Sequence, residues 1–250
     1  MLKAIFFDLD GTLLPMDEEK FTKLYFQLIS EAVKDKGYEP QKLIDTIWQG
    51  TKCMYKNNSG QTNEEVFWNY FGKIYGEEHV QDKKYFDAFY VNQFKQVKKA
   101  CGENPYAKEI VQYAKEKVGM VMLTTNPIFP KNGIKTRLEF LNLVEEDFDY
   151  ITTYENSFHC KPNPEYFKDL LHTFSLQSDE VILFGNNDME DYFCAKQAGI
   201  DCYLVGENLI LHKDENMNAP KIKMNEIKDI IEKEYNRRKN ENISIATPRT

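Results

Sequence analysis

The sequence lacks two features that would have assigned it to a membrane or nucleic-acid-binding class. No apolar run approaches the roughly 18 residues that a membrane-spanning helix requires. Basic residues are also outnumbered, with 32 Lys and Arg against 40 Asp and Glu, which gives a net charge of −8. Since nucleic acids and anionic membranes both bind to basic surfaces, we expect neither as a partner.

Cysteine and histidine are few, and their spacing excludes the common zinc motifs. The five cysteines form no CxxC pair, and the four histidines form no HExxH pair. An odd, scattered set of cysteines favours reduced thiols over a disulfide framework. The N-terminal apolar segment is too short for a signal peptide and has no cleavage site. These absences together predict a cytoplasmic protein.

The composition is that of a folded protein, with 42% hydrophobic and 29% charged residues among 250. Residues 4–7 form a short continuous apolar run, which is typical of a strand buried on both faces. From Asp17 onward, apolar residues recur with helical spacing in four amphipathic segments that reach residue 100. We therefore predict an all-helical, aromatic-rich insertion over residues 17–100.

After Gly102 the pattern alternates between strand and helix, which predicts βαβ units and a mostly parallel, doubly wound α/β sheet. The predicted helices lie near residues 105–117, 131–142, 164–174 and 189–198, and the predicted strands near residues 118–123, 150–153, 181–184 and 202–205. A last helix near residues 224–238 precedes a polar tail, 239–250, that we expect to be mobile. The predicted core thus comprises residues 1–16 and 101–238.

Polar clusters follow four of the predicted strands, where open α/β sheets bind their ligands. In the first, Asp8-Leu9-Asp10-Gly11-Thr12, two carboxylates can share one loop as nucleophile and as acid or base, although a solvated turn with a capping Asp has the same composition. In the second, Thr125 and Asn126 can bind an anion through a hydroxyl and backbone amides, or form an ordinary Asn-Pro turn.

The third cluster is Lys161-Pro162-Asn163-Pro164, directly before a predicted helix. Its lysine either supplies a fixed positive charge to a phosphate or is a surface residue in a Pro-rich turn. The fourth cluster runs from Gly185 to Asp191 and contains oxygen donors that suit Mg²⁺. Within it, Asn187 or Asp188 can alternatively cap the following helix.

The four clusters, in this order, resemble the motifs of the haloacid dehalogenase-like hydrolase superfamily, most of whose members cleave phosphate esters. The resemblance covers residues 1–16 and 103–210 and implies a Rossmann-like core. The helical stretch between the first two clusters is similar to the α-helical cap of one large subfamily. The resemblance therefore implies a Mg²⁺-dependent phosphatase that acts on a small phosphorylated metabolite.

The resemblance also implies roles for individual residues. Asp8 forms an aspartyl-phosphate, and Asp10 protonates the leaving alcohol and then deprotonates water. Thr125, Asn126 and Lys161 hold the phosphoryl oxygens. Implied ligands of Mg²⁺ are Asp8, Asp10 through its carbonyl, and Asn186 and Asp191 of the fourth cluster, with Asn187 or Asp188 as alternatives.

One position departs from the family pattern, because Asn186 stands where members usually have Asp. A neutral amide is a weaker ligand for Mg²⁺ than a carboxylate. The alternatives to a phosphatase are a dehalogenase, a phosphonate-cleaving enzyme or a phosphomutase of the same superfamily. A ligand-binding protein with weak catalysis is a further alternative, which only Asn186 favours.

Overall fold

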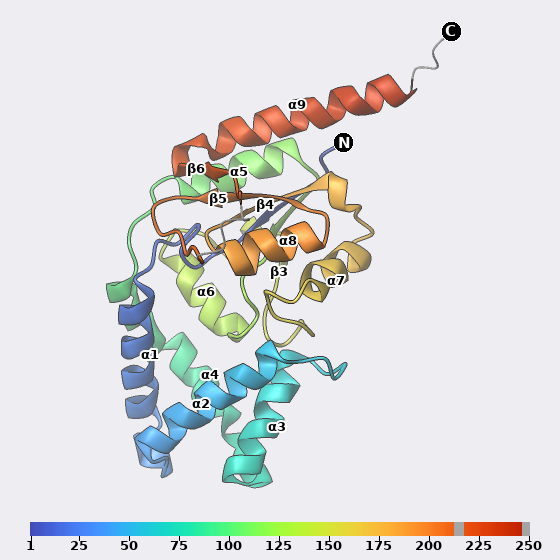
Figure 1. The fold of residues 1–250 in the computed structure, drawn as a ribbon. Helices are drawn as coiled ribbons and strands as arrows, with labels where there is room; N and C mark the ends of the chain where they lie inside the picture. The colour runs from blue at the N-terminus through green and yellow to red at the C-terminus, as the bar shows by residue number, and fades with distance from the viewer. Residues whose placement is uncertain (213–217, 247–250) are drawn as a thin grey trace.

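The computed structural model describes residues 1–212 and 218–246, the last five of these by backbone alone. Within these residues, six parallel strands form one sheet in the order β3-β2-β1-β4-β5-β6. Helices cover both faces of the sheet (Figure 1), which confirms the predicted doubly wound α/β fold. The strands are β1 (Ala4–Phe7), β2 (Met120–Leu123), β3 (Tyr150–Ile151), β4 (Val181–Gly185), β5 (Asp201–Val205) and β6 (Lys221–Ile222).

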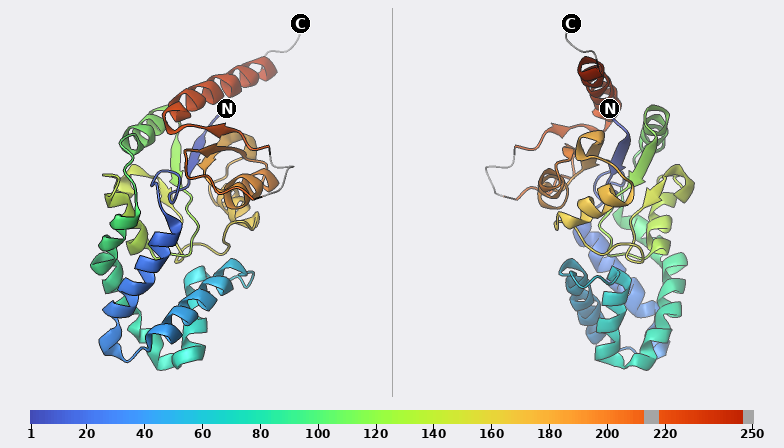
Figure 2. Two further views of the ribbon diagram at one scale, coloured as in Figure 1. Left: turned by 60° about the vertical axis from the view of Figure 1, so that its left-hand side comes forward. Right: turned by 90° about the vertical axis from the view of Figure 1, so that its right-hand side faces the viewer.

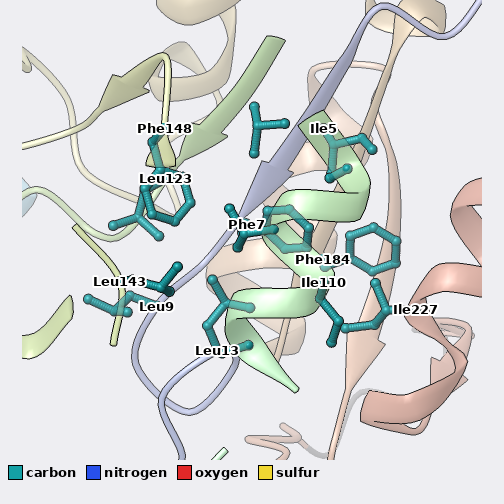
Figure 3. Packing of buried hydrophobic residues seen from close by; sticks show 14 of the residues in the cluster. Ile5, Phe7, Leu9, Leu13, Ile110, Leu123, Leu143, Phe148, Phe184 and Ile227 are labelled. Carbon is teal, nitrogen blue, oxygen red and sulfur yellow. The ribbon is translucent and has the colours of Figure 1, made fainter. Parts of the chain in front are cut away.

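The central strand β1 is completely buried, because alternate side chains enter two different hydrophobic clusters. Ile5 and Phe7 belong to one cluster with side chains of α5 (Ala107–Lys117), α6 (Lys131–Glu139) and α9 (Ile227–Ala246). Figure 3 shows Ile110 of α5 and Ile227 of α9 in this cluster. Ala4 and Phe6 face the opposite layer, formed by α7 (Glu165–Thr173) and α8 (Cys194–Gln197). The continuous apolar run of β1 is thus explained by helices on both sides.

Residues 17–100 form a separate helical layer with its own hydrophobic cluster, rich in aromatic side chains. Its elements are α1 (Glu18–Ala32), α2 (Pro40–Tyr55), α3 (Asn63–Tyr75), α4 (Lys83–Val91) and short 3₁₀ segments at 34–36, 77–82 and 93–100. This helical layer lies at the end of the molecule opposite α9 and the N-terminus (Figures 1 and 2). Residues 17–100 contribute no strand to the sheet, since they are all helical or irregular.

The helical layer leaves and rejoins the core at adjacent points of the chain. The amide of Asp17 donates to the carbonyl of Ala100 over 3.0 Å, and the amide of Gly102 donates to the carbonyl of Pro15 over 2.7 Å. Between them, Met16 and Cys101 form an isolated antiparallel bridge. The two connections therefore lie side by side, as expected for a unit inserted into one loop of the core.

The structure differs from the sequence-based prediction at three elements. Strand β6 was not predicted, because two residues, Lys221 and Ile222, are too few to show a period. The segment predicted as a helix over 189–198 begins as a π-helix at Asp188–Phe193 and becomes α-helical only at Cys194.

The last helix also extends beyond the predicted residues 224–238, because α9 continues to Ala246 and so includes residues 239–246; residues 247–250 of the predicted tail lie outside the described part of the chain. An ion pair at i,i+4 spacing, Arg237 Nη1 to Glu241 Oε1 at 3.1 Å, stabilises this extension. α9 spans 20 residues but is highly charged, and no helix in the described ranges has both the length and the apolar character that crossing a membrane requires.

Candidate active site

Asp8 lies at the carboxyl end of β1, where the chain turns away from the sheet. Its amide still donates to the Phe184 carbonyl of β4 over 2.9 Å, so the backbone at Asp8 is held by the sheet. The following turn requires Gly11, whose φ is +80°. A Cβ added at this position would lie 2.1 Å from Nδ2 of the Asn186 side chain. Glycine thus allows the first predicted cluster to pack directly against the fourth.

Lys161 joins two carboxylates in a buried triad. Its Nζ lies 2.8 Å from Asp8 Oδ1 and 2.6 Å from Asp191 Oδ1, and all three side chains are almost completely buried. Burial alone lowers the pKa of Lys161, but the charges of Asp191 and Asp8 outweigh it and hold that pKa well above its ordinary value. Lys161 is therefore a permanent cation inside the core.

Asp8 titrates unusually for an aspartate. Burial raises its pKa from 3.8 to about 7, the Lys161 ammonium opposes the increase, and the nearby charge of Asp191 adds to it. In the protein without a bound cation, Asp8 is therefore partly protonated near neutral pH. An additional positive charge at this position would ionise it.

Asp191 holds the loop of the fourth cluster in place through hydrogen bonds to its backbone. Asp191 Oδ2 accepts hydrogen bonds from the amides of Asn186 and Asn187 at 2.9 and 3.0 Å, while Oδ1 contacts Lys161. The Asp191 side chain packs against Gly185, where an added Cβ would lie 2.3 Å from the Asp191 carboxyl carbon. Both oxygens of Asp191 are thus engaged within the protein.

The two alternative ligands predicted in this cluster have other contacts. Asn187 Oδ1 caps the following helical segment by accepting from the amides of Met189 and Glu190 at 2.9 and 3.1 Å. Asp188 is buried and pairs with His212, accepting from its amide at 2.6 Å and contacting its Nδ1 at 2.5 Å. Asn186 is the side chain of this loop that shares a contact with Asp8 through the Thr12 hydroxyl.

Two oxygens converge on Thr12 in a way that suits a hard cation. The Thr12 hydroxyl lies 3.0 Å from Asp8 Oδ2 and 3.3 Å from Asn186 Oδ1, and it has only one proton to donate. One of these oxygens is therefore left without that donor, and oxygen atoms of this type are the ligands that Mg²⁺ prefers. Within the described residues, no three His, Cys, Asp or Glu side chains form a metal-binding group. A metal here would rely on an amide and on backbone oxygen as well as on carboxylate.

Asp10 has a partner that the sequence did not indicate. The completely buried Arg137 of α6 contacts Asp10 Oδ2 through Nη1, and its guanidinium carbon lies 4.4 Å from the centre of the Phe129 ring. Asp10 Oδ1 and Arg137 Nη2 are both buried without a hydrogen-bond partner. Arg137 follows Ile134 by three positions and so lies on the same buried face of α6. An arginine at a buried helical position needs an acidic partner, and this was the signal in the sequence that could have indicated the pair.

Asn126 belongs to a second polar network that the sequence did not indicate. Its Nδ2 lies 2.9 Å from Glu190 Oε2 and 3.2 Å from the Tyr55 hydroxyl, which itself donates to Glu190 Oε1 over 3.0 Å. Burial raises the pKa of Glu190, and Lys161 opposes the increase. Because Tyr55 lies on α2, this network connects the helical layer to the core beside Asp8.

A single cavity of about 390 Å³ brings the predicted residues together. Its lining includes both aspartates of the first cluster, both residues of the second and four residues of the fourth: Asp8, Asp10, Thr125, Asn126, Asn186, Asn187, Glu190 and Asp191. Lys161 reaches the same point through its contact with Asp8. Asp188 is not part of this lining, since it is turned toward His212.

The sequence family described as haloacid dehalogenase-like hydrolase matches residues 5–205 of the chain. No curated protein matches the chain in sequence. Similar solved structures include a 2-haloacid dehalogenase from Pseudomonas syringae pv. tomato DC3000, with 15% identity and a TM-score of 0.64 over 93% of this chain and 99% of that one.

A HAD phosphatase from Thermococcus onnurineus is similar at 18% identity and a TM-score of 0.58, over 92% of this chain and 98% of that one. CbbY from Rhodobacter sphaeroides, solved in complex with phosphate, is similar at 16% identity and a TM-score of 0.53, over 92% of this chain and 96% of that one. At these identities the structural similarity demonstrates a shared fold and nothing more specific.

Proposed function

Because the chain belongs to the haloacid dehalogenase-like hydrolase family, we propose that it is a Mg²⁺-dependent phosphatase that hydrolyses a small phosphorylated metabolite through a phosphorylated Asp8. The observation that carries the proposal is the contrast between two aspartates of one cavity. Asp8 is buried against the Lys161 ammonium, whereas Asp10 is 28% exposed and paired with Arg137. Such different surroundings suit a nucleophile and an acid–base group.

Asp8 attacks phosphorus through a carboxylate oxygen, and the bond to the leaving alcohol oxygen breaks. The attack requires an ionised Asp8 next to a negatively charged phosphate, so positive charge must offset their repulsion. Lys161 supplies one such charge at 2.8 Å from Asp8. Asp8, Asn186 and the Asp10 carbonyl would hold Mg²⁺, which would supply the remaining positive charge and favour the ionised form of Asp8.

Asp10 provides the proton that an alcohol leaving group needs, and later accepts a proton from the water that hydrolyses the aspartyl-phosphate. Arg137 holds Oδ2, so the transfer is assigned to Oδ1, which has no hydrogen-bond partner among the residues that the structure describes. Halide leaves without a proton, so dehalogenation has no use for an acid here. Asp10 therefore favours phosphate-ester hydrolysis over dehalogenation.

Thr125 and Asn126 follow β2 on the wall of the cavity, and backbone amides at such a strand end can donate to phosphoryl oxygens. Holding these oxygens in position is most of what phosphoryl transfer asks of a protein. Asp191 acts indirectly, because it fixes Lys161 and the loop that carries Asn186.

The test is hydrolysis of an aryl phosphate with and without Mg²⁺, using wild type and Asp8→Asn. We expect Mg²⁺-dependent activity that falls by several orders of magnitude in Asp8→Asn, because an amide cannot form the covalent bond. The matched control is Asp147→Asn, since Asp147 is paired with Lys108 away from the cavity. Activity in Asp8→Asn above about a tenth of wild type would reject the nucleophile assignment. Metal-independent chloride release from a 2-chloroalkanoic acid would favour a dehalogenase instead.

Asp10→Asn separates the acid role from a structural one. We expect a large loss of activity toward alkyl phosphates and a smaller loss toward aryl phosphates, because a phenolate leaves without protonation. The measurement is kcat of wild type and Asp10→Asn for each ester type, which gives the loss of activity toward alkyl and toward aryl phosphates. Equal losses for the two types would remove Asp10 from the role of acid.

A further inference from the structure

The cavity continues from the aspartates into the helical layer, and this extension has no role in the phosphoryl chemistry. At about 390 Å³ it is within the usual range for small-molecule pockets and larger than a phosphoryl group. Side chains from α1, α2 and α3 form its far wall. If a phosphate binds beside Asp8, the alcohol that carries it would lie against this far wall.

The far wall is mainly apolar. Its lining residues in α1, α2 and α3 include three phenylalanines, a tryptophan and two isoleucines: Phe21, Phe26, Ile29, Ile47, Trp48 and Phe67. Phe26 and Trp48 are adjacent there, with ring centres 5.3 Å apart. A ligand that covers this surface gains free energy in proportion to the apolar area removed from water.

Several polar groups of the far wall are already paired with one another. The hydroxyls of Tyr25 and Tyr90 lie 2.9 Å apart, and the Trp68 indole donates to the Tyr154 hydroxyl over 3.3 Å. The Thr51 hydroxyl donates to the Ile47 carbonyl of its own helix over 2.9 Å. A polyhydroxylated ligand would lose its hydrogen bonds to water here without gaining equivalent partners, which is unfavourable.

The charge of the lining also selects against a second anionic group. Its acidic members are Asp8, Asp10, Glu18, Glu190 and Asp191. Among the described residues that line the cavity, His212 is the sole basic side chain, and it is paired with Asp188. The two buried cations next to the cavity, Lys161 and Arg137, are already paired with carboxylates, Lys161 with Asp8 and Asp191 and Arg137 with Asp10, so neither is free to bind a second anionic group.

We infer that this site takes phosphate monoesters of apolar, uncharged alcohols, aliphatic or aromatic, and discriminates against sugar phosphates and substrates with a second acidic group. This substrate class rests on the proposed phosphatase function. The phosphate binds beside Asp8 and Lys161, and the apolar alcohol lies against Phe26, Trp48 and their neighbours. Specificity thus comes from the helical layer, and chemistry from the core.

The test is kcat/KM for ethyl, butyl and hexyl phosphate with Mg²⁺ present. The leaving alcohols are nearly equal in acidity, so their rates report binding of the chain. Burial of each methylene group is expected to raise kcat/KM by about fourfold. A hexitol phosphate and a hexyl phosphate with a terminal carboxylate should both react more slowly than hexyl phosphate, although neither has a worse leaving group.

The matched variants are Phe26→Ala and Leu28→Ala, both on α1. Phe26 lines the cavity and Leu28 does not, so only Phe26→Ala should lower the ratio of hexyl to ethyl kcat/KM. Hydrolysis of all esters at similar rates, or faster hydrolysis of the hexitol phosphate, would overturn the inferred substrate class and leave the phosphatase proposal intact. Failure to hydrolyse any alkyl or aryl phosphate would overturn both.

Discussion

Replacing Lys161 with methionine tests the buried triad most directly. The substitution keeps the length of the side chain and removes the one cation between Asp8 and Asp191. Removing one partner of a buried ion pair typically destabilises a protein by about 3–5 kcal/mol. Lys161 is 1% exposed and its two partners are 7% and 1% exposed. We therefore expect the substitution to lower the free energy of unfolding by an amount in this range near pH 6.

The stability lost in Lys161→Met should then grow as pH rises above about 7. In wild type the pKa of Asp8 is raised from 3.8 to about 7, so between these values the native state keeps a proton that the unfolded state releases, and stability falls as pH rises. Above about pH 7 the wild-type native state has released this proton, and its curve flattens. Without the ammonium, the Asp8–Asp191 pair retains one proton to higher pH. The difference between the two proteins should therefore widen by about 1.4 kcal/mol per pH unit.

The assay is urea unfolding between pH 5.5 and 8.5 with a chelator present, so that no divalent cation replaces the missing charge. The control is Lys108→Met, whose partner Asp147 lies 2.7 Å away in a partly exposed pair. Such a pair contributes at most about 1 kcal/mol, and its loss should not vary over this pH range. Parallel curves for wild type and Lys161→Met, or a loss below about 1 kcal/mol, would refute the buried-triad reasoning.

Two further predictions concern Asp10 and Asn186. Arg137→Met should destabilise the protein by about 3 kcal/mol, and adding Asp10→Asn should recover part of that loss. Unfolding of the two single variants and the double variant measures this coupling, and strictly additive losses would contradict the pairing. Asn186→Asp should lower the Mg²⁺ concentration needed for half-maximal activity, because it adds a carboxylate ligand. In chelator the same variant should have a lower Tm, because it loses the hydrogen bond that Asn186 Nδ2 donates to the Asn208 carbonyl over 2.8 Å. Equal or higher Mg²⁺ demand in a metal titration would place Asn186 outside the metal site.

The sequence by itself determined the α/β architecture and the helical insertion. Local patterns carry this information, because a strand buried on both faces and an amphipathic helix each have a distinct apolar period. Parallel strands also bring their carboxyl ends to one edge of the sheet. Asp8, Thr125 and Asn186 follow three such strands in sequence and line one cavity in the structure.

Only the tertiary structure decided which partner each polar side chain has. Periodicity places Arg137 on a buried face, but its contact with Asp10 spans 127 positions of sequence. Asp188 and Asn186 are two residues apart in one oxygen-rich loop, yet one faces His212 and the other faces Asp8 through Thr12. Likewise, the aromatic residues of the helical layer have the spacing of core residues, yet several of them, from four different helices, line the cavity. The apolar pattern of the sequence predicts which side chains are buried. Which residues they contact depends on the packing of segments that are distant in sequence.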